Sequence, residues 1–214
     1  MRLQLTKGKT MNRRQALVTA GAALGSAATV AMSGRLLTPA AQACELKGTP
    51  LEAMHLHLCA FHVAQNDPKL QVEAHHYCMP LRAGVFQCLV MDSNKPGARI
   101  LGVEYIVTDP IYQTLSAEEK KSWHPHAYEV TSGLLVAPSL PEEEENKLMA
   151  TVKTTWGKTW HTWPDPSTDL PLGQPALMWA FTKDGQIRPE LIARRDKGLN
   201  ISTEKIKRRR AGKF

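Results

Sequence analysis

The sequence predicts an α+β fold, a single domain in which an antiparallel β-sheet is packed by several short helices. The main observation is a set of three apolar runs, at 71–79, 85–91 and 99–108, separated only by short turns, which is typical of a strand meander. A helix is expected before this meander and mixed elements after it. Strands and helices do not alternate in the way that would indicate a parallel sheet.

Residues 1–43 differ in composition from the rest of the chain and are expected to be a cleaved export signal. They contain six basic residues and no acidic one, and an Ala/Gly-rich, weakly apolar run follows the pair Arg13-Arg14. This pattern resembles a twin-arginine signal with an A-x-A cleavage site just before Cys44. We therefore expect a periplasmic or secreted protein. The alternatives are a membrane anchor, for which the run is too rich in Gly, Ser and Thr, and a lipidated Cys44.

Residues 44–204 are expected to form the domain, and 205–214 a basic, disordered tail. Of 27 Lys and Arg and 20 Asp and Glu, the export signal takes six basic residues, which leaves 21 basic and 20 acidic side chains. This near-neutral balance gives no reason to expect nucleic acid as a partner. No apolar segment after residue 43 is long enough to cross a bilayer, so any contact with a lipid or membrane surface would be peripheral.

The remaining elements are assigned from hydrophobic spacing and from turn and capping residues. Residues 51–65 are predicted to form an amphipathic helix, because Leu51, Met54, Leu58 and Phe61 recur at helical spacing. A short helix is then expected to begin at Thr108, followed by a helical turn capped by Ser116 and Glu119 and by a strand from about 128 toward 136. The last elements are a helix at 141–155, strands at 158–163 and 176–181, and a helix at 189–197 that is ended by Gly198.

The segment 71–78, which reads Q-V-E-A-H-H-Y-C, holds an unusual density of reactive side chains. Because side chains alternate along a strand, Glu73 and His75 are expected on one face, and His76 and Cys78 on the other. The two histidines therefore cannot point into the same site. Any site here must be completed by residues from elsewhere in the chain.

Histidines and carboxylates on several elements predict a site for a divalent metal. Glu104 interrupts an apolar run, and a buried carboxylate has to be paired, hydrogen-bonded or bound to a metal. Imidazole nitrogens and carboxylate oxygens suit Zn, Fe, Mn, Ni or Cu, and two or three histidines with one carboxylate leave a position for water or substrate. The polar side of the predicted helix at 51–65 would add a ridge of ligand types, namely Glu52, His55, Cys59 and His62.

Two other interpretations of these residues stay open. The histidines can be structural, with their nitrogens satisfied by hydrogen bonds inside the fold. Alternatively, Cys78 or Cys59 could form a thiolate pair with a histidine for nucleophilic catalysis, although no motif for a nucleophile elbow or an oxyanion loop accompanies them. Cys59 and Cys88 are otherwise expected to be small buried hydrophobic residues. No catalytic residue is assigned from the sequence.

A series of motifs also carries a resemblance to a known family. In order, they are E-A-H-H-Y-C, Q-C-L-V-M-D-S, G-V-E-Y-I-V, E-E-K-K-S-W-H-P-H, W-G-K-T-W-H-T-W, L-P-L-G and R-P-E-L-I-A-R-R-D. With these, the sequence from about Leu51 to Thr203 resembles the oil-body-associated protein family (DUF1264-type), as an exported microbial member. The resemblance implies association with seed lipid bodies in the plant proteins, and it favours His57 over His55 and adds His161 to the histidines of interest.

The predicted function combines these observations. We expect an exported soluble protein whose pocket of histidines and glutamates binds a divalent metal. The alternative is a non-catalytic lipid-surface or interaction module whose histidines are structural, with exposed apolar residues near 134–136 or around Trp160 and Trp163. The predicted metal ligands are His57, Glu73, His75, His76, Glu104, His124 and His126.

Overall fold

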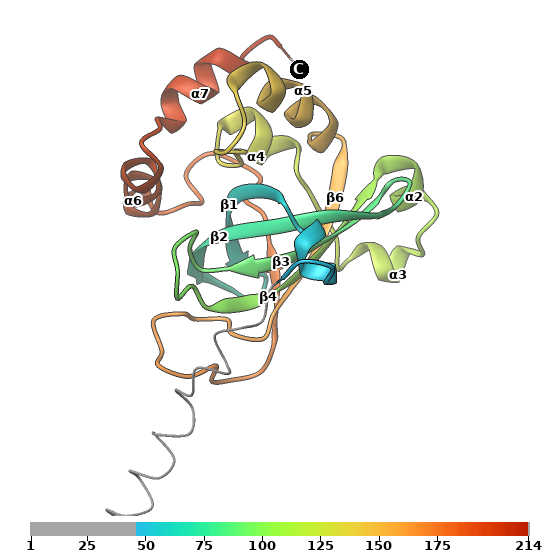
Figure 1. The fold of residues 1–214 in the computed structure, drawn as a ribbon, viewed down its shortest axis with the longest axis vertical. Coiled ribbons are helices and arrows are strands. Elements are labelled where there is room, and N and C mark those ends of the chain that lie inside the picture. Colours follow the sequence, from blue (N-terminus) through green and yellow to red (C-terminus); the bar gives the residue numbers. More distant parts are fainter. Residues whose placement is uncertain (1–45, 214) are drawn as a thin grey trace, which may run out of the picture. The chain divides into compact units, whose positions relative to one another are not determined.

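The computed structural model describes residues 46–213, which form an antiparallel sheet packed by short helices, as predicted (Figure 1). The strands are β1 (Leu56–Ala64), β2 (Asp67–Arg82), β3 (Val85–Met91), β4 (Ile100–Thr108), β5 (His124–Pro125), β6 (Thr155–His161) and β7 (Ala176–Trp179). The helices are the 3-10 helix η2 (Pro50–Ala53), α2 (Asp109–Gln113), α3 (Ala117–Lys120), α4 (Ala127–Ser132), α5 (Glu142–Val152), α6 (Pro189–Leu199) and α7 (Thr203–Arg210).

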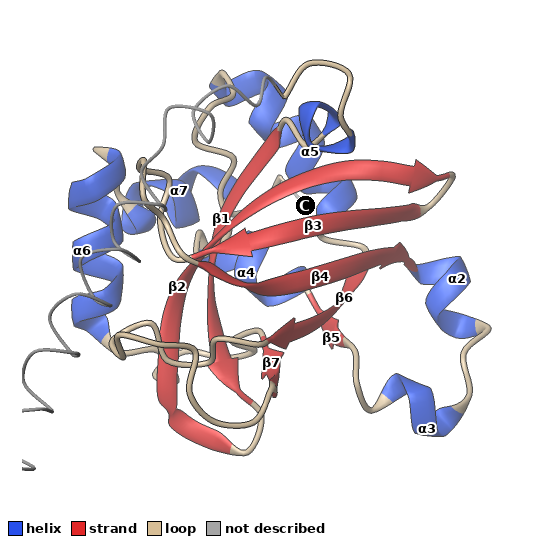
Figure 2. Ribbon diagram, turned by 60° about the horizontal axis from the view of Figure 1, so that its bottom comes forward, coloured by secondary structure: helices blue, strands red, loops and turns tan. Residues whose placement is uncertain are grey.

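The sheet closes on itself. Its strand order is β4-β3-β2-β1-β7-β6-β5, and β4 also pairs with β6, from Gly102 to Thr108. Figure 2 shows the strong curvature of the strands and the group α4, α5, α6 and α7, which lies apart from α2 and α3. Because of the closure, each strand has an inner and an outer face, and the alternation of side chains decides which residues enter the interior.

Apolar side chains and a disulfide fill much of the interior. Cys78 of β2 and Cys88 of β3 are direct partners across the sheet, are buried, and form a disulfide. The expectation that Cys88 is a lone buried hydrophobic residue is therefore wrong. The pairing depends on the register between β2 and β3, which the sequence does not display. Further apolar residues of the interior are Ala64, Val72, Ala74, Val90, Leu101 and Met178.

The first element differs from its prediction. Residues 51–65 do not form a helix: only the short η2 is helical, and β1 begins at Leu56. This strand lies between β2 and β7 and is buried along nearly its whole length. A strand covered on both faces has a nearly continuous apolar sequence, and such a run cannot be distinguished from a buried helix by spacing alone. The ridge of ligand types proposed for that helix does not exist.

The C-terminal part contains further differences. The strand expected toward 136 is instead the helix α4, and α6 runs through Gly198 to a left-handed Asn200. The tail expected to be disordered forms α7, whose last residue Arg210 is buried. Its guanidinium donates to the backbone oxygen of Val130 and pairs with Glu145 at 3.0 Å. The run of basic residues in the sequence does not indicate that one of them pairs with Glu145, which is distant in the chain.

The outer face of the sheet is covered in one part and open in another. On β1, Phe61 packs with Leu134 and with Leu191 of α6. On the opposite side of the closed sheet, Val103 of β4 and Trp160 of β6 face each other in the register and are exposed. In the part of the chain that the structure describes, no helix combines the length and the apolar character needed to cross a membrane.

Candidate functional site

Glu104 occupies the inner face of β4 and is only 2% exposed. Its partners across the sheet are Cys88 of β3 and Thr159 of β6. Histidines from three other strands and from the residue before α4 reach the same place, because their positions alternate into the closed interior. They are His62 of β1, His76 of β2, His124 of β5 and His126.

The two oxygens of the Glu104 carboxylate face different histidines. Oε2 lies 2.8 Å from Nε2 of His76 and 3.7 Å from Nε2 of His62, and these two nitrogens are 3.1 Å apart. Oε1 lies 3.2 Å from Nε2 of His126 and 3.4 Å from Nε2 of His124. These five residues are called the inner cluster below. It consists of two triads that share one carboxylate, and within each triad the ligand atoms lie within 4.8 Å of one another.

Other polar groups hold the rings of the inner cluster in place. Nδ1 of His62 lies 3.0 Å from Nε2 of His161, and Nδ1 of His126 lies 2.8 Å from the hydroxyl oxygen of Thr155. In His62 and His126, the ring nitrogen that points away from Glu104 therefore has a partner of its own. Contacts of this kind orient histidine ligands at metal sites.

Gly157 on β6 makes room for one of the two triads. A Cβ atom at this position would lie 2.1 Å from Oε1 of Glu104, 2.7 Å from Nε2 of His124 and 2.8 Å from Nε2 of His126. The three potential ligand atoms thus converge on the space that any other residue would fill. Gly157 is paired with Ile106 of β4 and with His124 of β5, so its position is fixed by the sheet.

Burial sets the charge states of the inner cluster. It opposes ionisation of Glu104, but the attraction of His76 and hydrogen bonds from His124 and His126 hold the pKa of this carboxyl well below its usual range. Burial lowers the pKa of His62 well below 6.5 and also lowers the pKa of His124. Metal binding requires an ionised carboxylate and neutral imidazoles, and these shifts favour that state for Glu104, His62 and His124.

A small cavity adjoins the inner cluster and contains a second buried carboxyl group. The cavity has a volume of about 10 Å³ and is lined by the inner cluster together with Glu129 and apolar residues. Burial and the charge of Glu104 raise the pKa of Glu129 well above its usual range, and its Oε1 has no hydrogen-bond partner. Buried polar atoms of His124, Thr159 and His161 near the cluster lack partners as well. Unpartnered polar atoms are uncommon in folded interiors and point to an unseen water or ion.

A separate group of polar residues lies on the outer face of β1 and β2. Nε2 of His75 lies 3.0 Å from Oε1 of Glu73 and 3.9 Å from Sγ of Cys59. Nδ1 of His75 lies 2.9 Å from Nε2 of His57, whose Nδ1 lies 3.3 Å from the hydroxyl oxygen of Ser139. We call Cys59, Glu73 and His75 the outer triad. Burial, followed by the charge of His75, lowers the pKa of His57 to about 4, and burial raises the pKa of Cys59 to about 12.

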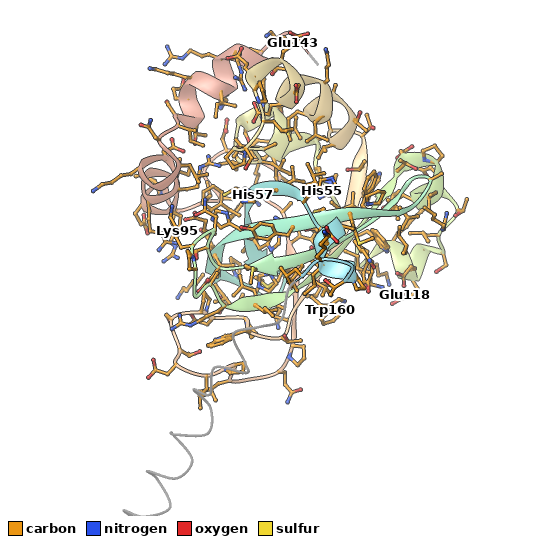
Figure 3. The ribbon with its side chains drawn as sticks, in the orientation of Figure 1. His55, His57, Lys95, Glu118, Glu143 and Trp160 are labelled. Atoms are coloured by element: carbon orange, nitrogen blue, oxygen red, sulfur yellow. A yellow bond between two sulfur atoms is a disulfide. The ribbon has the colours of Figure 1, made fainter. Side chains whose placement is uncertain are left out.

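The predicted ligand residues thus fall into two separate groups. His76, Glu104, His124 and His126 come together in the inner cluster, whereas Glu73 and His75 belong to the outer triad, with His57 beside it. The expectation that the two adjacent histidines of β2 face different sites agrees with this arrangement. Figure 3 labels His57, which is buried, and His55, which is exposed.

Three residues of these sites were absent from the predicted ligand set. The sequence places His62 and Cys59 only on a helix that does not form, because the nearly continuous apolar run around them fits a buried strand and a helix equally well. Glu129 was assigned to a strand that is in fact α4. The thiolate pair considered for Cys78 is wrong, because this residue is in the disulfide.

Comparison with known proteins places the chain among plant relatives. A family model described as "Protein of unknown function (DUF1264)" matches residues 48–213. Oil body-associated protein 1A of Zea mays is 43% identical over 163 residues, which are 76% of this chain and 68% of that protein. The chain belongs to the oil-body-associated protein (DUF1264) family.

Other relatives support this assignment. Oil body-associated protein 1B of Arabidopsis thaliana is 42% identical over 72% of this chain and 65% of its own length. Oil body-associated protein 2B of Zea mays is 42% identical over 81% of this chain and 70% of its own length. The chain thus spans about two-thirds of the length of these family members. No solved structure matches it.

Replacement of Gly157 tests the packing around Glu104. We expect Gly157→Ala to lower the free energy of unfolding by about 1–3 kcal/mol, because the added methyl group must displace buried atoms of the inner cluster. Gly198→Ala is the matched control, because a Cβ at this helical position meets nothing within 4 Å and alanine favours a helix by up to about 1 kcal/mol. Urea unfolding measures both variants. Equal stability of the two would contradict the tight approach at Gly157.

Proposed function

We propose that this protein binds a divalent transition metal at the inner cluster. The observation that carries the proposal is the pair of triads that share Glu104, whose carboxylate oxygens lie 2.8–3.7 Å from the histidine nitrogens. Two ligand atoms bound at about 2.0–2.1 Å to one tetrahedral metal lie roughly 3.3 Å apart, which is close to these separations. Imidazole and carboxylate donors suit Zn, Fe, Mn, Ni or Cu.

The charge of Glu104 favours a bound cation over a purely structural network. Among the described residues, no Lys or Arg forms an ion pair with this carboxylate, and its ionic partners are all histidines. Burial of a carboxylate without a compensating positive charge costs several kcal/mol. Protonation of one imidazole could supply that charge, but the neighbouring rings would then have to stay neutral, because two imidazolium groups this close together repel each other. A divalent ion compensates the carboxylate and uses the lone pairs of the rings at the same time.

The surroundings of the cluster suggest what such a metal could do. The adjoining cavity of about 10 Å³ corresponds to roughly one water molecule, and all five side chains are buried. A bound metal would therefore have room for a water-sized ligand, with Glu129 beside it as a protonated carboxyl group. We therefore propose metal binding as the function, without a reaction on a larger substrate.

Metal analysis of the purified protein without residues 1–43 tests this proposal. We expect about one or more equivalents of a transition metal to stay bound after dialysis, and addition of that metal to the stripped protein to raise its melting temperature. Glu104→Gln and His126→Ala should each remove most of this metal, because each removes a ligand from a triad.

The exposed residues His55 and Glu118, labelled in Figure 3, provide matched controls. His55→Ala and Glu118→Gln change the same residue types outside the two triads and should leave metal content unchanged. Circular dichroism separates loss of ligand from loss of fold. Less than about a tenth of an equivalent of metal, with no thermal stabilisation by any of the five metals, would refute the proposal.

We further propose that the protein is exported to the periplasm or beyond it. The signal predicted at 1–43 lies outside the described residues, and the buried Cys78–Cys88 disulfide supports the proposal, because disulfides persist mainly in oxidising compartments. A twin-arginine route would carry a folded domain, in which a metal could already be bound.

Fusion of residues 11–44 to a reporter tests the export route. We expect replacement of Arg13-Arg14 by two lysines to abolish export of the fusion, because the twin-arginine pair is read specifically and lysine keeps only the charge. Arg35→Lys is the control, because it makes the same type of substitution away from the twin-arginine pair, and this fusion should be exported normally. Unchanged export of the double-lysine fusion would exclude this route.

A second candidate function is peripheral contact with a lipid surface, for which the outer face of β4 and β6 is the supporting observation. Val103, Tyr105 and Trp160 are 41%, 44% and 40% exposed, and Val103 and Trp160 are adjacent across the two strands. Trp160 is labelled in Figure 3, away from the helices α4 to α7. The relatives named above are called oil body-associated. By contrast, residues 134–136, the other region considered for such a patch, are buried.

Flotation with phosphatidylcholine-coated triacylglycerol droplets tests lipid contact. We expect the protein to float with the droplets in the presence of a chelator, and the variant Val103→Ser/Trp160→Ser to stay in solution, because it loses the apolar side chains that would enter the surface. Leu170→Ser/Leu172→Ser is the control, since it removes two exposed leucines from the loop between β6 and β7, outside the paired strands. Absence of flotation, or equal flotation of all three proteins, would rule out this surface.

A further inference from the structure

A pocket with a volume of about 650 Å³ opens onto the outer triad. It lies between α6 and the loops around Asn94 and Pro166. Glu73 and His75 belong to its lining, and Arg194 of α6 lies 3.5 Å from Glu73. The Glu73 side chain is 14% exposed, whereas Cys59 and His75 behind it are buried. The pocket thus gives solvent access to one edge of an otherwise buried group of ligands.

We infer that Cys59, Glu73 and His75 form a second metal site, which takes a zinc-like ion through one sulfur, one oxygen and one nitrogen. Nε2 of His75 lies 3.0 Å from Oε1 of Glu73 and 3.9 Å from Sγ of Cys59, and the three ligand atoms lie within 4.8 Å of one another. For tetrahedral bonds of about 2.0 Å to nitrogen or oxygen and 2.3 Å to sulfur, the corresponding separations are roughly 3.3 and 3.6 Å. Small side-chain adjustments bring the three atoms into this geometry.

The contacts behind His75 resemble those that support metal-bound histidines. Its Nδ1 lies 2.9 Å from Nε2 of His57, and Nδ1 of His57 lies 3.3 Å from the hydroxyl oxygen of Ser139. His57 is also stacked on Tyr77, with ring centroids 5.0 Å apart. This chain fixes the His75 ring so that Nε2 faces Glu73 and Cys59. Second contacts of this kind typically affect metal affinity by about 10–100-fold.

The outer triad offers chemistry that the inner cluster lacks. Metal binding here displaces one proton from the Cys59 thiol, and the resulting thiolate favours Zn and other ions that accept sulfur ligands. Three protein ligands leave a fourth position, as in catalytic zinc sites, and the solvent-exposed edge of Glu73 places that position toward the pocket. This site uses none of the residues of the inner cluster, so the test of one metal site does not decide the other.

Cobalt substitution distinguishes the two sites because only one of them contains sulfur. We expect Co²⁺ added to the metal-free protein to give a near-ultraviolet thiolate-to-cobalt charge-transfer band that saturates at about one equivalent per chain. Cys59→Ser should abolish this band, and Glu73→Gln should weaken cobalt binding at this site about tenfold or more. His57→Ala should weaken it by about 10–100-fold while the band is retained at saturation.

Two controls make the outcome specific. Cys44→Ser removes the other cysteine outside the disulfide and should leave the band unchanged, as should Glu104→Gln, which alters only the inner cluster. Circular dichroism establishes that Cys59→Ser and Glu73→Gln are folded, and Glu73 is the safer position because it is partly exposed. Absence of the band in the wild-type protein, or its persistence in Cys59→Ser, would overturn the second site whatever happens at Glu104.

Discussion

The burial of the Glu104 carboxylate is the constraint around which the interior of this protein is arranged. A charge at 2% exposure inside a closed sheet needs compensation, and the chain provides it with imidazoles instead of lysine or arginine. The closure of the sheet brings these imidazoles together, since β1, β2, β5 and β6 all border the same interior. Gly157 leaves the necessary space, and the disulfide between β2 and β3 lies one strand away in the same row. A cluster of this type is expensive to bury unless it binds something, which is the physical basis for the metal proposal.

The helices outside the sheet complete the interior instead of forming a core of their own. His126 and Glu129 enter it from the N-terminal end of α4, so the position of this short helix matters for the cluster. Two buried arginines hold it: Arg210 donates to the backbone oxygen of Val130, and Arg195 donates to those of Gly133 and Leu134. Both arginines come from the last 20 residues of the described chain. The helices α6 and α7 therefore help to position His126 and Glu129, because their arginines hold the backbone of α4 and of the residues that follow it.

Local sequence patterns were sufficient to predict the strands β2, β3 and β4, the capped turn at Ser116 and the burial of Glu104. In these segments, alternation, turn residues and a polar interruption act within a few residues of one another. What could not be predicted depends on partners distant in the chain. His62 lies next to Glu104 because residues 56–64 form a strand of the closed sheet. The pairing of Cys78 with Cys88 depends on the register between β2 and β3. The helix α7 looked like a solvated basic tail because nothing in its sequence reveals that Arg210 meets Glu145.

The strand β2 places two chemically different groups on opposite sides of one layer. His76 faces the dry interior, where its neighbours are imidazoles and a carboxylate, whereas His75 faces a cysteine, a glutamate and a pocket of about 650 Å³. Because the side-chain period of a strand is two, a slip of one residue in its register would exchange these environments completely. The disulfide and the pairing with β1 hold that register. The same alternation that keeps the two histidines apart also assigns them different ligand partners, with the free thiol of Cys59 and solvent access on the outer side, and two cysteines joined in a disulfide on the inner side.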